Sequence, residues 1–140
     1  MNGIKRIALV ATFLLAPTLG MADNLSDSSS FLCTSVFASR CTPDGECEGG
    51  PAWNYNVPQF IEIDLNKKSM STTKASGENR TTPIKNLERE DGLIILQGVQ
   101  LGRAFSFVIN EETGVASIAV ALDGHGVIVS GACTPMPESN

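Results

Sequence analysis

The residues best suited to catalysis in this sequence are few, and they do not form a recognisable catalytic set. His125 is the only histidine among 140 residues, and it lies between Gly124 and Gly126, two residues after Asp123. An Asp-x-His pair can bind a metal or relay a proton, but two flanking glycines are more typical of a hairpin tip. One histidine leaves a single way to build a Ser-His-Asp or Cys-His site, and no Gly-x-Ser-x-Gly nucleophile motif is present. We therefore expect no catalytic residues and no turnover.

Acidic residues form two further candidate sites. Glu62 and Asp64 alternate along one segment, which places both carboxylates on one face of a strand, about 7 Å apart, and glycosidases use paired carboxylates at similar separations. Asp44, Glu46 and Glu48 supply the oxygen ligands that calcium prefers, without the spacing of an EF-hand. Solvated positions on a strand and in a turn explain both groups more simply. A carboxylate-based hydrolase is the alternative function, and we expect no bound metal and no cofactor.

The only tryptophan and the only tyrosine lie close together in a segment rich in Gly, Pro and Asn, residues 49–58. Trp53, Asn54 and Tyr55 combine large apolar surfaces with polar groups, as recognition anchors for proteins or sugars do. The other interpretation is that Trp53 folds inward and closes one end of a small barrel. We favour this second interpretation, which predicts that Trp53→Ala lowers stability more than it lowers affinity for a partner. The three residues are nevertheless the candidate binding site.

The N-terminal residues 1–22 have the features of a secretory signal peptide. Lys5 and Arg6 precede an apolar run at 7–15, and Gly20 to Ala22 places small residues at positions −3 and −1 of a cleavage site. The run is too short to span a bilayer, which takes roughly 20 apolar residues. We expect a periplasmic or secreted protein without stable membrane insertion after cleavage.

The acidic composition excludes one class of partner. Removing residues 1–22 takes away two of ten basic residues and none of the fifteen acidic ones, so the formal net charge changes from −5 to −7. A surface of this charge repels phosphate backbones. We therefore expect no nucleic-acid partner.

The four cysteines all lie beyond the expected signal peptide, and an even number in an exported domain predicts two disulfides. Four cysteines allow three pairings, of which we favour Cys41–Cys47 with Cys33–Cys133. Pro43-Asp44-Gly45 between the first two is strong turn chemistry that would fold the chain back on itself. The second pair would tie the first strand to the last. A metal site would need closer cysteine spacing or more histidines.

The remaining sequence predicts an all-β fold. Apolar residues recur with a period of two, as in Ile61, Ile63 and Leu65, and Gly-containing turns separate the runs at intervals of roughly 10–12 residues. The expected strands cover residues 31–37, 59–66, 69–74, 81–87, 93–99, 104–110, 115–122 and 127–133. Pro83 predicts that its strand is either an edge strand or irregular, and the sole helical turn is expected within 86–91.

These elements predict an antiparallel meander of about eight short strands, a small barrel or sandwich stapled by two disulfides. A bridge between the first and last strands favours a closed or nearly closed up-and-down barrel. The expected organisation is a disordered lead-in at 23–30, a single β domain at 31–135 and a disordered tail at 136–140.

Several short segments together resemble a group of short, uncharacterised exported proteobacterial proteins with a Cys-rich N-terminal segment and a C-terminal Gly-Ala-Cys-Thr-Pro. The segments are Phe31-Leu32-Cys33, Cys41 and Cys47 around an acidic turn, Phe60 to Asp64, Leu96-Gln97-Gly98, Gly102 to Ser106, and Gly131 to Pro135. This resemblance implies a bacterial, periplasmic setting and brings no activity with it.

A non-catalytic periplasmic binding or interaction domain is the function that these observations favour. Its partner would be a small ligand, a sugar or another exported protein, which includes an inhibitor-like role by analogy with other small stapled β domains. A structural subunit of an envelope assembly is a further hypothesis.

Overall fold

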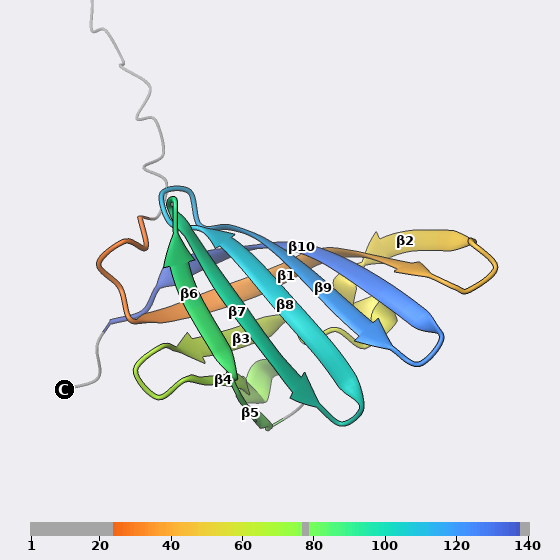
Figure 1. The fold of residues 1–140 in the computed structure, drawn as a ribbon, viewed down its shortest axis with the longest axis horizontal. Coiled ribbons are helices and arrows are strands. Elements are labelled where there is room, and N and C mark those ends of the chain that lie inside the picture. Colours follow the sequence, from red (N-terminus) through yellow and green to blue (C-terminus); the bar gives the residue numbers. More distant parts are fainter. Residues whose placement is uncertain (1–23, 77–78, 138–140) are drawn as a thin grey trace, which may run out of the picture.

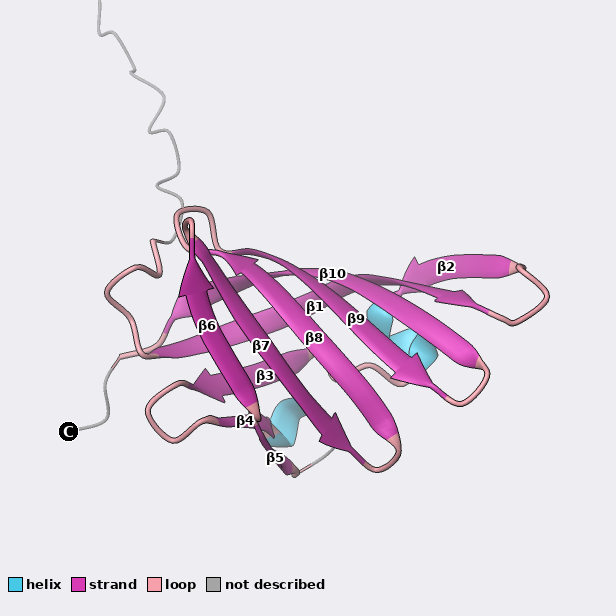
Figure 2. Cartoon of the chain, in the orientation of Figure 1, coloured by secondary structure: helices cyan, strands magenta, loops and turns pink. Residues whose placement is uncertain are grey.

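The strands of the chain form one antiparallel sheet that curls into a half-barrel (Figure 1). The computed structural model describes residues 24–76 and 79–137, so the signal peptide expected at 1–22 and residues 138–140 of the expected tail lie outside the described residues. The strands are β1 (Ser30–Cys41), β2 (Cys47–Pro51), β3 (Phe60–Asp64), β4 (Ser69–Thr72), β5 (Thr81–Pro83), β6 (Asn86–Glu90), β7 (Leu93–Gln100), β8 (Arg103–Asn110), β9 (Val115–Leu122) and β10 (His125–Pro135), with two short 3-10 helices, η1 (Ala52–Tyr55) and η2 (Lys74–Ser76). The predicted all-β, antiparallel class is confirmed (Figure 2).

The sheet curls because the chain joins its two edges directly. The strand order is β5-β4-β3-β1-β10-β9-β8-β7-β6, so β5 and β6 are the two edges. Only Ile84 and Lys85 separate β5 from β6, and so short a link requires the edges to lie close together. Gly98 on β7 permits this approach, since a Cβ there would lie 2.9 Å from the carbonyl oxygen of Pro83. Of the two alternatives predicted for the strand with Pro83, an edge strand or an irregular one, the structure shows the edge strand.

Strand β1 is the longest of these strands, and it changes its neighbour at a bulge. Its first half pairs with β3 and its second half with β2, while β10 runs along its other side. The register with β10 shifts between Ser35 and Phe37, and a bulge of this kind bends and twists a strand. Gly131 lies opposite Ser35, where a Cβ would overlap the carbonyl oxygen of Thr34. Glycine is therefore the residue that fits at this crossing.

Inward-facing side chains of the alternating strands form the core. Its largest fully buried members are Phe31, Leu25, Ile63, Ile94, Leu96, Ile109 and Val129. One of these, Leu25, belongs to the segment expected as a disordered lead-in. That expectation is wrong for residues 24–30, because this segment packs on the half-barrel: Leu25 is buried, and Ser26 and Ser28 accept hydrogen bonds from Arg89.

The N-terminal segment packs where two hairpin turns meet. The Leu25 N–H donates to the carbonyl oxygen of Glu111 (2.6 Å), and the Glu111 N–H donates to that of Gly92 (2.9 Å). Arg89 donates to the carbonyl oxygens of Ser26 and Ser28, each at 2.8 Å. Leu25 therefore closes the end of the half-barrel that the β6–β7 and β8–β9 turns border. At the start of the expected disordered tail, the Met136 N–H donates to Ser30 O (2.9 Å).

Three differences from the expected strands have one physical cause. Residues 86–91 were expected to include a helical turn, but Asn86–Glu90 is strand β6, paired along β7. Strand β2, Cys-Glu-Gly-Gly-Pro, has no apolar alternation and was not predicted. Strand β1 extends to Cys41 rather than 37. In each case a neighbouring strand supplies backbone hydrogen bonds that the side-chain pattern does not reveal. The added strands β2 and β6 raise the expected eight strands to ten.

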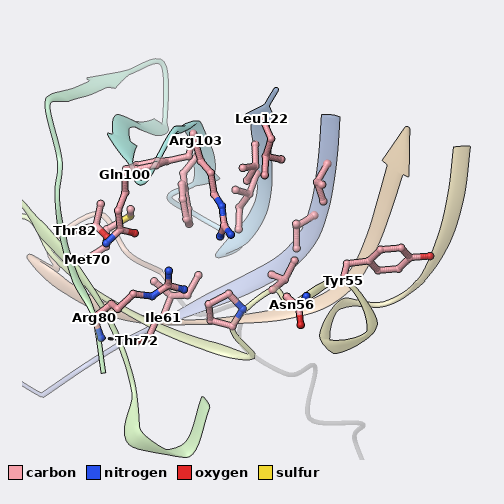
Figure 3. Close-up of a pocket in the computed structure, with 18 of the residues that line it drawn as sticks. Tyr55, Asn56, Ile61, Met70, Thr72, Arg80, Thr82, Gln100, Arg103 and Leu122 are labelled. Atoms are coloured by element: carbon pink, nitrogen blue, oxygen red, sulfur yellow. Dashed lines mark hydrogen bonds between the residues drawn. The ribbon is translucent and has the colours of Figure 1, made fainter. Parts of the chain in front are cut away.

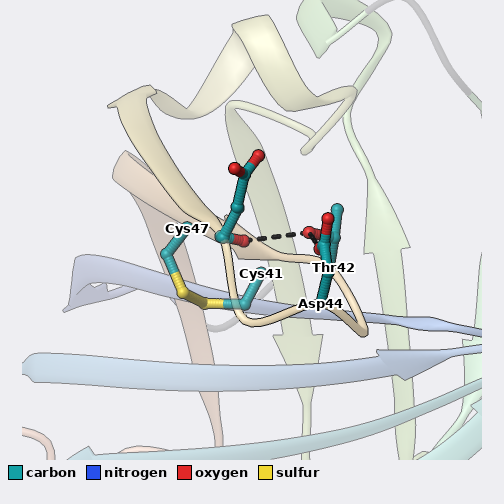
Figure 4. Close-up of a disulfide and its surroundings, with 5 residues drawn as sticks. Cys41, Thr42, Asp44 and Cys47 are labelled. Carbon is teal, nitrogen blue, oxygen red and sulfur yellow. Dashed lines mark hydrogen bonds between the residues drawn. A yellow bond between two sulfur atoms is a disulfide. The ribbon is translucent and has the colours of Figure 1, made fainter.

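Both predicted disulfides are confirmed. Cys33 and Cys133 face each other across β1 and β10 with their Cα atoms 3.9 Å apart, and both are buried. Cys41 and Cys47 close the β1–β2 hairpin (Figure 4) with their Cα atoms 4.1 Å apart. These bonds indicate an oxidising environment outside the cytoplasm. Within residues 24–76 and 79–137, no helix has the length and apolar character that crossing a membrane requires.

Candidate functional site

A pocket of about 400 Å³ lies at the end of the half-barrel away from Leu25 (Figure 3). Strand alternation turns apolar side chains from five strands into it: Ile61, Met70, Phe105, Phe107, Ile118, Val120, Leu122, Val127 and Val129. The volume falls within the range of roughly 300–1,000 Å³ that small-molecule sites occupy. The interior therefore suits an apolar group.

The mouth of the pocket is polar because strand ends and turns form it. The β7–β8 hairpin contributes Gln100 and Arg103, which face each other in register. Arg80 precedes β5, His125 begins β10, and Arg40 lies near the end of β1. Among the described residues that line the pocket, three are arginines and none is an aspartate or glutamate. The pocket thus combines an apolar interior with a positively charged rim.

The arginines of the rim differ in their contacts. Arg40 forms an ion pair with Glu48 at 3.1 Å. The backbone N–H of Arg80 donates to the Thr72 hydroxyl oxygen at 2.9 Å. The side chain of Arg103 is exposed and makes no hydrogen bond or ion pair with any residue that the structure describes. Figure 3 shows Arg80 and Arg103 extending toward the middle of the pocket from different walls.

The predicted binding residues are divided between the pocket and the outer surface. Trp53 is 60% exposed and does not close the barrel end, so the interpretation favoured from the sequence is wrong. Helix η1 instead turns Ala52 inward, where it is fully buried. Tyr55 packs against the core and lines the pocket, whereas Asn54 is exposed. Of the three predicted residues, only Tyr55 contributes to this site.

We expect Trp53→Ala to leave stability nearly unchanged. The side chain loses little buried area, and surface substitutions usually change the free energy of unfolding by at most about 0.5 kcal/mol. Denaturant titration followed by circular dichroism measures this without relying on tryptophan fluorescence. Tyr55→Ala is the matched comparison and should lower stability more, because its ring packs on the core. A loss above about 1 kcal/mol in the Trp53 variant would contradict its exposed position.

His125 begins β10 directly after the tight turn at Asp123 and Gly124, so it lies beside the hairpin tip that the flanking glycines predicted. Its Nδ1 atom is 3.0 Å from the backbone carbonyl oxygen of Asp123, and the side chain is exposed at the pocket rim. The ring therefore contacts the Asp123 backbone and not its carboxylate. This geometry differs from the carboxylate–imidazole pair of a Ser-His-Asp triad.

The carboxylates Glu62 and Asp64 do not line the pocket. They alternate with the buried Ile61 and Ile63 along β3, as predicted, and Glu62 is exposed. The Lys67 N–H donates to Asp64 at 2.9 Å, and the Lys67 amino group lies 3.0 Å from it. The backbone bond, followed by the side-chain contact, lowers the pKa of Asp64 below its ordinary value. This carboxylate stabilises the β3–β4 turn.

The acidic residues of the Cys41–Cys47 loop also have local partners. The Thr42 hydroxyl donates to Asp44, and this bond is the main cause of the lowered pKa of Asp44 (Figure 4). Glu48 pairs with Arg40. In the part of the chain that the structure describes, no three His, Cys, Asp or Glu residues gather where they could hold a metal ion.

Sequence reasoning missed the arginines of the rim. Arg103 begins a strand on which Phe105 and Phe107 share its face, and this period-two relation was a usable signal. Arg80 has no comparable spacing from an apolar residue of the pocket, because only the curl of the sheet brings the start of β5 near β8. The sequence thus located part of the pocket wall but not the pocket.

Comparison with protein-family models finds no match for this chain, and no curated protein matches it significantly. The function must therefore be inferred from the chemistry of the pocket itself.

Proposed function

We propose that this protein is a non-catalytic binding domain, exported to the periplasm or beyond, that holds a small ligand in the pocket at the end of its half-barrel. The observation that carries this proposal is an apolar cavity of about 400 Å³ open at a polar rim. No aspartate or glutamate is among its described lining residues, and the lone His125 faces a backbone carbonyl. These features favour binding over acid–base chemistry.

The pocket wall favours ligands with a substantial apolar part. Phe107, Ile118 and Val129 in this wall are 4%, 5% and 0% exposed, so a ligand that lies against the wall removes part of its apolar surface from water. Burial contributes about 0.8 kcal/mol for each methylene group. A chain of ten methylenes therefore contributes about 8 kcal/mol before the cost of association, so the pocket favours ligands with a long apolar chain over ligands with a short one.

We expect Val120→Trp to weaken binding of a neutral apolar probe, decanol, at least about tenfold. Val120 faces the pocket, and an indole there occupies part of the cavity. Titration calorimetry measures the affinity, and thermal melting checks that the variant is folded.

Ala119→Trp is the matched control, because Ala119 is the preceding residue on β9 and is exposed on the other face of the sheet. It should bind decanol as the wild type does. Absence of saturable decanol binding to the wild type, or equal binding by folded Val120→Trp, would refute the pocket as the binding site.

Recognition of an exported protein is a second candidate function. Trp53 is 60% exposed, and its neighbour Asn54 is also exposed in the segment that borders the pocket. Exposed aromatic side chains on a loop are frequent interaction anchors. Capture of partners from a periplasmic extract by wild type and by Trp53→Ala compares the two functions directly.

A further inference from the structure

We propose that the ligand of the pocket is an amphipathic anion, an apolar chain with one carboxylate or phosphate group, whose charged group Arg103 binds at the rim. This inference rests on the proposed binding function and specifies the ligand. It combines the distribution of charge, the contacts of Arg103 and the gradient of exposure along β8.

The charge of the rim is opposite to that of the whole chain. The chain carries a formal net charge of −5, yet Arg40, Arg80 and Arg103 line the pocket with no acidic residue among its described lining. Clefts lined by one sign of charge raise the local concentration of oppositely charged ligands. The rim therefore favours anions, although the chain as a whole carries a net negative charge.

Arg103 is the rim residue best placed to bind the charged group. Its guanidinium extends into the pocket without an ion pair to a described residue, whereas Arg40 is paired with Glu48. A guanidinium stays protonated at physiological pH and binds carboxylate or phosphate through two parallel hydrogen bonds. Gln100, opposite Arg103 in the hairpin, adds an amide that can donate to the same group. Arg80 brings a second positive charge from another wall.

Strand β8 sets the orientation of the ligand. Arg103, Phe105 and Phe107 lie two residues apart and share the pocket-facing side. Their exposure falls along the strand, since Arg103 is exposed, Phe105 is half-buried and Phe107 is 4% exposed. A ligand bound along this face places its charged end at the mouth and its apolar chain between the aromatic rings and the β9 and β10 side chains.

Titration calorimetry with decanoate, decyl phosphate and decanol tests the inference. We expect one or both anions to bind the wild type at least about tenfold more tightly than decanol, as one charge-assisted pair permits. Which anion binds more tightly identifies the charged group, and added salt should weaken anion binding alone. Arg103→Gln should weaken anion binding about tenfold and leave decanol binding unchanged. Arg103→Lys should restore part of the loss.

Lys67→Gln is the matched charge control, because it also removes one positive charge but lies in the β3–β4 turn, outside the pocket lining. It should bind the anions as the wild type does. Equal affinity for decanol and both anions, or unchanged anion binding by Arg103→Gln, would overturn the anion inference and leave the proposed function standing. Failure of all three ligands to bind would overturn both.

Discussion

Replacing Cys33 and Cys133 together by alanine is expected to lower the free energy of unfolding by about 4.7 kcal/mol. The bond joins residues 100 apart in the sequence, and in the chain-entropy model a cross-link that closes a long loop removes the most freedom from the unfolded chain. It also joins β1 to β10, the pair in the middle of the strand order. Because small domains have only about 5–15 kcal/mol of stability in total, this variant should approach the limit of folding at physiological temperature.

The second disulfide provides the control. Cys41 and Cys47 are six residues apart and close an exposed hairpin, so their replacement by alanine should cost about 2 kcal/mol. Urea titrations of both double variants and the wild type, at equal ionic strength, give the two differences. A smaller loss for the Cys33–Cys133 variant than for the Cys41–Cys47 variant would show that the long cross-link does not dominate stability.

Leu25→Ala should lower the free energy of unfolding by about 3 kcal/mol. Leu25 is fully buried, and its backbone is bonded to Glu111, so truncation leaves a cavity that the neighbouring turns cannot easily fill. Leu→Ala substitutions in packed cores cost about 2–5 kcal/mol. Denaturant unfolding measures the loss, and hydrogen exchange at Glu111 should increase with it.

Leu101→Ala is the matched control for the same chemical change. Leu101 is 75% exposed in the β7–β8 turn, so its truncation should change stability by less than about 0.5 kcal/mol. Equal, small effects of the two substitutions would mean that the N-terminal segment does not pack on the half-barrel in solution. Such a result would support the disordered lead-in that the sequence predicted.

The errors made from the sequence share a physical origin. Leu25 is an isolated apolar residue among Ser, Asp and Asn, and nothing in its neighbourhood predicts burial until the β6–β7 and β8–β9 turns converge on it. Trp53 is large and apolar enough to fill a barrel end, but η1 places Ala52 inward instead. Both outcomes depend on which residues distant in sequence meet, and a local pattern does not contain that information.

Residues close together in the sequence were sufficient to predict the strand class, the inward faces of the strands and the Cys41–Cys47 disulfide. Alternation of apolar and polar residues determined the all-β class and the inward faces of strands such as β3, because the side chains of a strand alternate between its two faces. Turn residues between Cys41 and Cys47 brought that pair together, and an even cysteine count fixed the number of disulfides.

Only the tertiary structure decided that the sheet curls, that β1 changes partner at its bulge, and that Arg80 and Arg103 meet over one apolar pocket. The physical reason is that a pocket is made by segments whose separation along the chain is unrelated to their separation in space. Short-range preferences shape each strand, whereas the closing of two sheet edges across Ile84 and Lys85 creates the cavity.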